Sequence, residues 1–236
     1  REKILSQAII MKHHLLECNM GIRQVAIIGA GTMGAGIAQV CAQSEWNTIL
    51  YDAFPEGLEK GMQRIDAFWD KGIARGKTTA QQKQDWSKNL RAETNLEAAV
   101  RGCDLIIEAV PEILELKQKI FLEVEQYVGE TTILATNTSS LSIGKIASVM
   151  KYPERLIGMH FFNPVPIMKL LELVKHDKTS EATVSVAEEA GLVMNKTTIL
   201  VNDVPGFATS RLGVVLGNEA IRMLADGVAS AKDIDT

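Results

Sequence analysis

The stretch IRQVAIIGAGTMG, residues 22–34, decides the fold of this chain. Its first half is a short run of apolar and β-branched residues, which predicts a buried strand. A G-x-G-x-x-G loop made of Gly29, Gly31 and Gly34 follows at once, and helical spacing continues over residues 32–44. The first glycine permits a tight turn, the second lets the backbone approach a pyrophosphate, and the third lets helix and strand pack closely. This strand–loop–helix context predicts a dinucleotide-binding unit.

An aspartate ends the second predicted strand, NTILYD, at the position where a ribose would bind. Asp52 follows Gly34 by 18 positions, and its carboxylate is suited to accept hydrogen bonds from ribose hydroxyls and to repel a 2′-phosphate. Residues 53–57, AFPEG, contain no arginine for such a phosphate, so we expect NAD rather than NADP. Thr32 and Met33 lie in the first helical turn, which faces the phosphates. The alternative to a dinucleotide site is an ordinary glycine turn and a strand-end aspartate that bind no ligand.

Length and composition indicate one large globular domain and part of a second. The chain has 236 residues, 46% of them hydrophobic, and a formal net charge of -4. No apolar run approaches the roughly 20 residues of a membrane span, and the mild acidity gives no attraction to nucleic acid, so we expect neither partner. Cys18, Cys41 and Cys103 have no C-x-x-C spacing. We therefore expect no disulfide framework, no metal site and a reducing, cytoplasmic setting.

Strands alternate with helices along most of the chain. The predicted strands are residues 22–29, 47–52, 104–110, 131–137, 155–162, 169–175 and 197–202. The predicted helices are residues 32–44, 56–75, 78–90, 113–128, 142–150 and 180–191, and the helix over 78–90 opens with a threonine cap. The alternation predicts an α/β fold, a Rossmann-type doubly wound and mostly parallel sheet.

The pattern changes after DVPGF, near Pro205 and Gly206. Residues 207–225 predict one long helix with no strand behind it, so we expect a cofactor domain over 21–205 and a helical second domain over 206–236, truncated at its end. Residues 1–20 have neither the apolar core nor the cleavage site of a signal peptide, and we expect an extension outside the fold. Within it, His13 and His14 lack further ligands at metal-binding spacing and are interpreted as an exposed pair.

Polar residues follow two more predicted strands, in the segments EAVPE and TNTSS. Glu112, Lys117, Asn137 and Ser139 fall there. Doubly wound folds bind their ligands at the carboxyl ends of strands, so we expect these side chains on one rim of the sheet. Ordinary loop polarity and helix capping explain a single site of this kind. Two such sites on one rim favour ligand binding.

The segment GMHFFNPVPIMKLLELV, residues 158–174, holds one histidine and one carboxylate in a stretch otherwise suited to a core. His160 has the side chain of a general base near neutral pH, because an unperturbed histidine has a pKa of about 6.5. Glu172 could hold the ring and stabilise the imidazolium that forms. Taken alone, each residue is also compatible with a structural or surface role. Next to a dinucleotide loop, the pair favours catalysis.

These segments resemble the L-3-hydroxyacyl-CoA dehydrogenase family, which includes the 3-hydroxybutyryl-CoA dehydrogenases. The resemblance covers about residues 22–236 through the glycine loop, EAVPE, TNTSS, HFFNPVP, MKLLELV and DVPGF. It implies NAD-dependent oxidation of an L-3-hydroxyacyl-CoA to the 3-oxoacyl-CoA, and the reverse, in fatty-acid or butanoate metabolism. It implies a catalytic pair of His160 and Glu172, with Ser139 near the substrate hydroxyl. The implied cofactor-binding residues are Gly29, Gly31, Thr32, Met33, Gly34, Asp52, Glu112, Lys117, Asn137 and Asn163.

The chain departs from the family pattern in its last segment. Many members carry an asparagine that contacts the substrate where this chain has Ser210, and the family's helical domain extends further and forms a homodimer. The anionic CoA would meet the basic stretch DKGIARGK, with Lys71, Arg75 and Lys77, although a solvated helical face explains that stretch equally well. The rival functions are a dehydrogenase of a sugar acid such as L-gulonate and a non-catalytic dinucleotide-binding protein.

Overall fold

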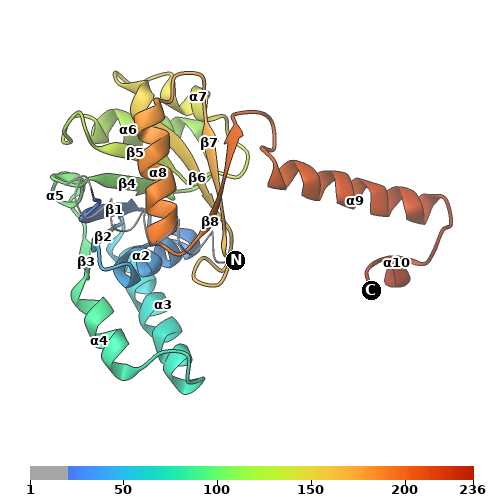
Figure 1. Ribbon diagram of the computed structural model, residues 1–236, viewed down its shortest axis with the longest axis horizontal. Coiled ribbons are helices and arrows are strands. Elements are labelled where there is room, and N and C mark those ends of the chain that lie inside the picture. Colours follow the sequence, from blue (N-terminus) through green and yellow to red (C-terminus); the bar gives the residue numbers. More distant parts are fainter. Residues whose placement is uncertain (1–20) are drawn as a thin grey trace, which may run out of the picture.

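The structure, a computed structural model, describes residues 21–236. The predicted extension of residues 1–20, with His13, His14 and Cys18, lies outside the described residues. The centre of the fold is an eight-stranded sheet in the order β3-β2-β1-β4-β5-β6-β7-β8 (Figure 1). The strands are β1 Gln24–Ile28, β2 Asn47–Tyr51, β3 Leu90–Glu93, β4 Leu105–Glu108, β5 Ile133–Thr136, β6 Leu156–Phe161, β7 Leu170–Lys175 and β8 Thr197–Asn202. Only β6 and β7 pair antiparallel, which confirms the predicted doubly wound, mostly parallel sheet.

Helices cover both faces of this sheet. They are α2 Thr32–Gln43, α3 Pro55–Ala74, α4 Ala80–Lys88, α5 Leu96–Val100, α6 Leu114–Val124, α7 Ile143–Ala147 and α8 Glu181–Val193, with a short 3-10 helix at Pro153–Arg155. One apolar core joins α2, α3 and α8 to one face, and a second joins α5, α6 and α7 to the other. Within β1, Val25 and Ile27 enter the first core while Ala26 and Ile28 enter the second. Strands buried on both faces have nearly continuous apolar sequences, which explains the pattern of residues 22–28.

Two elements differ from the sequence prediction. The sequence predicts a helix that ends at residue 90 and no further element before residue 104. The structure has the strand β3 and the helix α5 in this interval, with β3 beginning at Leu90 itself. The strand is four residues long, pairs with β2 at the edge of the sheet and keeps Arg91 and Ala92 exposed, so it lacks a buried apolar run. The helix has five residues and is too short to show a helical period.

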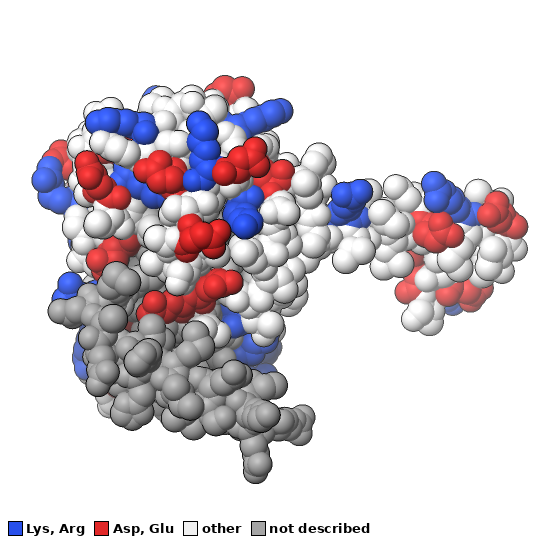
Figure 2. Space-filling model, turned by 45° about the horizontal axis from the view of Figure 1, so that its top comes forward, with Lys and Arg blue, Asp and Glu red and all other residues white. Residues whose placement is uncertain are grey.

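The remaining helices project from the body as an arm (Figure 1). They are α9 Thr209–Ala225 and α10 Ala231–Ile234, and none of their residues is buried. Large apolar side chains such as Leu212 and Leu216 are 70% and 73% exposed. On the face drawn in Figure 2, lysines and arginines are intermixed with aspartates and glutamates over the body. Among the described residues, no helix has the length and apolar character needed to cross a membrane.

Candidate active site

The glycine loop joins β1 to α2 at the carboxyl edge of the sheet. Gly29 has a φ of 102°, and a Cβ there would lie 2.8 Å from the carbonyl oxygen of Ala109. A Cβ on Gly34 would lie 1.7 Å from the carbonyl oxygen of Gly29, so only glycine permits this close packing of helix on loop. Gly31 has nothing within 4 Å of its Cβ position. The open side of the loop therefore leaves room for a phosphate in front of the helix N-terminus.

A cavity of about 610 Å³ opens beside this loop. It is lined by Gly29, Gly31, Thr32, Met33, Tyr51, Asp52, Phe54, Leu96, Val110, Lys119, Ile120 and Glu123, among others. The carboxylate of Asp52 accepts hydrogen bonds from the backbone N–H of Ala30, at 2.8 Å, and of Phe54, at 3.0 Å. These two contacts fix the carboxylate at the cavity wall, and each oxygen keeps the capacity to accept a further hydrogen bond, such as one from a ribose hydroxyl.

The donor set and the walls of this cavity fit a dinucleotide. Apolar side chains from β2, α5 and α6, among them Tyr51, Leu96 and Ile120, provide a surface on which an adenine can pack. The glycine loop and the start of α2 provide N–H groups for a pyrophosphate. Lys119 and Glu123 of α6 also line the cavity. Neither residue is recognisable as a lining residue from the sequence, because a charged side chain on an amphipathic helix normally faces solvent.

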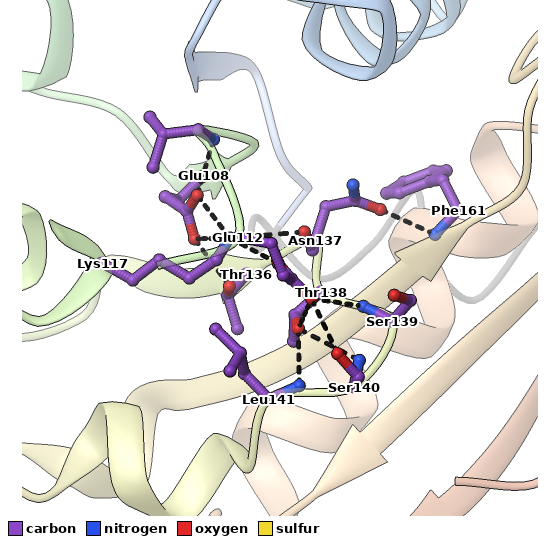
Figure 3. Close-up of polar contacts among 11 residues, drawn as sticks. Glu108, Glu112, Lys117, Thr136, Asn137, Thr138, Ser139, Ser140, Leu141 and Phe161 are labelled. Carbon is purple, nitrogen blue, oxygen red and sulfur yellow. Dashed lines mark hydrogen bonds and ion pairs between the residues drawn. The ribbon is translucent and has the colours of Figure 1, made fainter. Parts of the chain in front are cut away.

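A buried ion pair supports the rim of the sheet between β4 and α6 (Figure 3). The ammonium of Lys117 donates to both carboxylate oxygens of Glu108, at 2.8 and 2.9 Å, and both side chains are completely buried. The hydroxyl of Thr136 and the backbone N–H of Val110 also donate to Glu108, at 2.6 and 2.7 Å. Burial raises the pKa of Glu108, an effect that the neighbouring Lys117 opposes. The Lys117 ammonium also lies 3.5 Å from Oε2 of Glu112, so it links the core to the rim without lining the cavity. Its role toward the cofactor stays a prediction.

Glu112 organises the turn that follows β5 (Figure 3). Its carboxylate accepts hydrogen bonds from the Thr138 hydroxyl and from the backbone N–H of Ser139, the latter at 3.1 Å. Although burial acts to raise the pKa of Glu112, the Thr138 hydroxyl and the Lys117 charge hold that pKa below its usual value. The carboxylate therefore stays ionised and shapes the turn. The carbonyl oxygen of Ser139 also accepts a hydrogen bond from the Ser210 hydroxyl at 3.2 Å, so the two expected substrate contacts are neighbours.

The histidine and the glutamate of residues 158–174 form a cross-strand pair between β6 and β7. β6 and β7 pair antiparallel with His160 opposite Glu172, and Nδ1 of the ring lies 2.8 Å from Oε2 of the carboxylate. The glutamate is completely buried and the histidine is 7% exposed. Aromatic rings flank the imidazole, with the centroids of Phe162 and Phe207 at 4.4 and 6.2 Å. A carboxylate at Nδ1 fixes the tautomer of the neutral ring and leaves Nε2 free to accept a proton.

The carboxylate of Glu172 is also held by the start of α9. Oε1 accepts the backbone N–H groups of Ala208 and Thr209, at 2.9 and 3.1 Å, and Oε2 accepts the Thr209 hydroxyl at 2.9 Å. Burial acts to raise the pKa of Glu172, but the hydrogen bonds from His160, Ala208 and Thr209 outweigh it and lower the pKa. These partners carry no signal in the sequence. Ala208 and Thr209 follow the DVPGF segment directly, and nothing in that stretch specifies a contact to a strand 36 positions earlier.

Three further residues expected at the site are Asn137, Asn163 and Arg75, and each lies in a different part of the fold. The side-chain oxygen of Asn137 accepts the backbone N–H of Phe161 at 3.0 Å, which ties the turn after β5 to the end of β6. Asn163 lines a second cavity of about 270 Å³, together with Lys71 of α3. Arg75 is the C-cap residue of α3 and lines neither cavity, whereas Lys71 lines the second. The substrate role of Arg75 stays a prediction.

Comparisons with known proteins point to one family. The family model of the 3-hydroxyacyl-CoA dehydrogenase NAD binding domain matches residues 24–204, and that of its C-terminal domain matches residues 206–236. A probable 3-hydroxyacyl-CoA dehydrogenase of Caenorhabditis elegans is 43% identical over 220 residues, covering 91% of this chain and 71% of that protein. The 3-hydroxybutyryl-CoA dehydrogenase of Clostridioides difficile is 40% identical over 212 residues, covering 90% and 75%. The crystal structure of (S)-3-hydroxybutyryl-CoA dehydrogenase from Ralstonia eutropha aligns with a TM-score of 0.87 at 38% identity, covering 90% of this chain and 75% of that one.

Proposed function

The chain belongs to the NAD-binding 3-hydroxyacyl-CoA dehydrogenase family, and we propose that it interconverts an L-3-hydroxyacyl-CoA and the 3-oxoacyl-CoA through its His160–Glu172 pair. The observation that supports this most strongly is the buried 2.8 Å contact between the two side chains. The pair lies on β6 and β7 of the same sheet whose strand β1 leads into the glycine loop, and His160 is near the carboxyl end of β6. When bound, NAD supplies the hydride acceptor for the carbon that carries the hydroxyl.

His160 is the proposed base. Its Nε2 takes the hydroxyl proton as the hydride leaves C3, so the ring becomes imidazolium while Nδ1–H keeps its bond to Glu172. The carboxylate, ionised because its pKa is lowered by its donors, offsets the new positive charge. The apolar and aromatic surroundings exclude water and strengthen that interaction. In the reverse direction the imidazolium returns the proton to the ketone oxygen.

The substrate is proposed to lie between the turn after β5 and the start of α9. Ser139 and Ser210 are adjacent there, and their hydroxyls are the candidate contacts to the acyl-CoA. The second cavity, lined by Asn163 and Lys71 among others, is the candidate path toward the CoA phosphates. We retain Asn163 as the proposed nicotinamide neighbour and Arg75 as a proposed basic contact, and we add Lys71.

We propose a cofactor domain ending at residue 205 and a helical domain beginning at residue 206 that forms a homodimer. The arm of α9 carries exposed apolar side chains, including Leu212, Val215 and Leu216 on one face of the helix, and an exposed apolar surface of this kind is typical of an interface. We also propose a reducing compartment such as the cytoplasm, because both described cysteines, Cys41 and Cys103, are buried free thiols.

The test is a steady-state assay of NADH oxidation with acetoacetyl-CoA, run in parallel with the oxidation of L-gulonate by NAD. We expect turnover of acetoacetyl-CoA, no turnover of L-gulonate, and a loss of at least about 10²-fold in kcat for His160→Ala, the scale of a positioned acid–base group. Turnover of L-gulonate alone would favour the sugar-acid enzyme. NADH binding without turnover of either substrate would favour a non-catalytic role.

A further inference from the structure

The first turn of α9 contributes three hydrogen bonds to a single carboxylate. Both backbone N–H groups, of Ala208 and Thr209, reach Oε1 of Glu172, and the Thr209 hydroxyl reaches Oε2 at 2.9 Å. Oε2 is also the oxygen that His160 contacts through Nδ1 at 2.8 Å. One carboxylate oxygen is thus shared by a ring from β6 and a hydroxyl from the helical arm.

In this arrangement the Thr209 hydroxyl and the His160 ring both donate to the same negatively charged oxygen of Glu172. A hydroxyl that donates to a carboxylate stabilises the negative charge and leaves less of it to stabilise an imidazolium. It also restricts rotation of the carboxylate about its last bond, since each oxygen is held from two directions. Among the described residues, the only titratable group that contacts this carboxylate is His160; the arm contributes neutral donors alone, at the positive end of a 17-residue helix.

We propose that Thr209 is a positioning residue that sets the orientation and the base strength of His160 through Glu172. This proposal rests on the proposed catalytic pair. It assigns the start of the helical arm a part in the chemistry, beyond its role as a connection to the second domain. Any movement that withdraws α9 from the sheet removes all three donors from Glu172 at once.

The test compares Thr209→Val, which keeps the branched shape and removes the hydroxyl, with Thr209→Ser, which keeps the hydroxyl. The readout is the pH profile of kcat/KM for oxidation of L-3-hydroxybutyryl-CoA, whose acidic limb reports the loss of the neutral base. In Thr209→Val we expect the limb to move to higher pH by about half a unit, because the carboxylate charge is less compensated and stabilises the imidazolium more. Thr209→Ser should restore the original limb, and Thr209→Val should shift nothing in a Glu172→Gln background.

The outcomes separate this proposal from the catalytic assignment. If His160→Ala loses activity while Thr209→Val keeps the wild-type profile, the catalytic pair stands and the role of Thr209 is refuted. A change confined to the melting temperature, a limb that moves to lower pH, or a Thr209→Ser variant that behaves like Thr209→Val would also overturn the proposal. If His160→Ala stays active, the proposed function itself fails.

Discussion

Glu172→Gln removes one charge from the site and keeps the size of the side chain. In the oxidation direction the ring of His160 gains a positive charge next to this position. Two unit charges about 4 Å apart interact by about 4 kcal/mol at an effective dielectric constant of about 20. Since each 1.36 kcal/mol is a factor of ten in rate, the complete loss of this interaction corresponds to about three decades. We therefore expect kcat for L-3-hydroxybutyryl-CoA oxidation to fall by about 10²- to 10³-fold.

The hydrogen bonds of the carboxylate add a second effect. Four donors meet its two oxygens, two at each oxygen. A glutamine has one acceptor oxygen, so its NH₂ group either faces the two backbone N–H groups or forces the Thr209 hydroxyl and the His160 ring to accept instead of donate. We expect the variant to be less stable than the wild type near neutral pH. Because the pKa of Glu172 is lowered in the fold, its contribution to stability is complete above about pH 4.3, the ordinary glutamate value, and is lost as the pH falls through the folded pKa. The stability difference between the two proteins should shrink accordingly in acid.

Three measurements complete this test. Steady-state rates give kcat, fluorescence titration gives the NADH affinity, and denaturant unfolding at two pH values gives stability. Glu181→Gln on α8 is the matched control, because its side chain is 89% exposed and its charged partner, at 3.9 Å, is Lys175 and not a member of the pair. NADH affinity should barely change in either variant, since Asp52 and the glycine loop are intact. A Glu172→Gln enzyme within about threefold of the wild-type kcat would refute the catalytic role of the glutamate.

Asp52→Ser should narrow the preference for NADH over NADPH, because the carboxylate that repels a 2′-phosphate is lost; kcat/KM for both cofactors measures the change. Lys117→Met should lower the free energy of unfolding by about 3 kcal/mol or more near neutral pH, since it leaves Glu108 buried without its cation. Because the pKa of Glu108 is raised, the protonated form becomes available as the pH falls, and denaturant unfolding should show a smaller loss in acid. Burial raises the pKa of Cys41 to about 12 and of Cys103 to about 11, so neither thiol should react with maleimide at pH 8 in the native protein, as peptide mapping would show.

The sequence was most informative where local chemistry determines the structure. The glycine loop was predictable because Gly29 has a positive φ and Gly34 packs directly against backbone atoms. Both conditions require glycine, so they are visible in the sequence. The strands of the parallel core were predictable because burial on both faces requires continuous apolar runs. The pairing of His160 with Glu172 needed more than pattern, since twelve positions separate them and only the antiparallel register of β6 and β7 brings them together.

Long-range polar contacts were not predictable. Lys117 lies on an amphipathic helix, where a lysine normally faces solvent. Only the fold shows that its ammonium forms a buried ion pair with Glu108. Thr209 has no local feature that distinguishes it from any other residue at the start of a helix. The strand β3 was missed because an edge strand with exposed side chains carries no hydrophobic signal. In each case the information lies in which elements meet, and a single sequence does not contain it.

The antiparallel ladder between β6 and β7 sets His160 opposite Glu172 through strand register. A substitution at the exposed tip of the loop between these strands, such as at Ile167, therefore leaves the two side chains opposite each other, provided that the strands keep their register. A deletion of one residue inside β7 has the opposite effect, because it turns the glutamate to the other face of the sheet. Substitutions at the exposed tip of the loop are therefore the conservative way to alter the surface near the pair, whereas an insertion or deletion within either strand separates the two side chains.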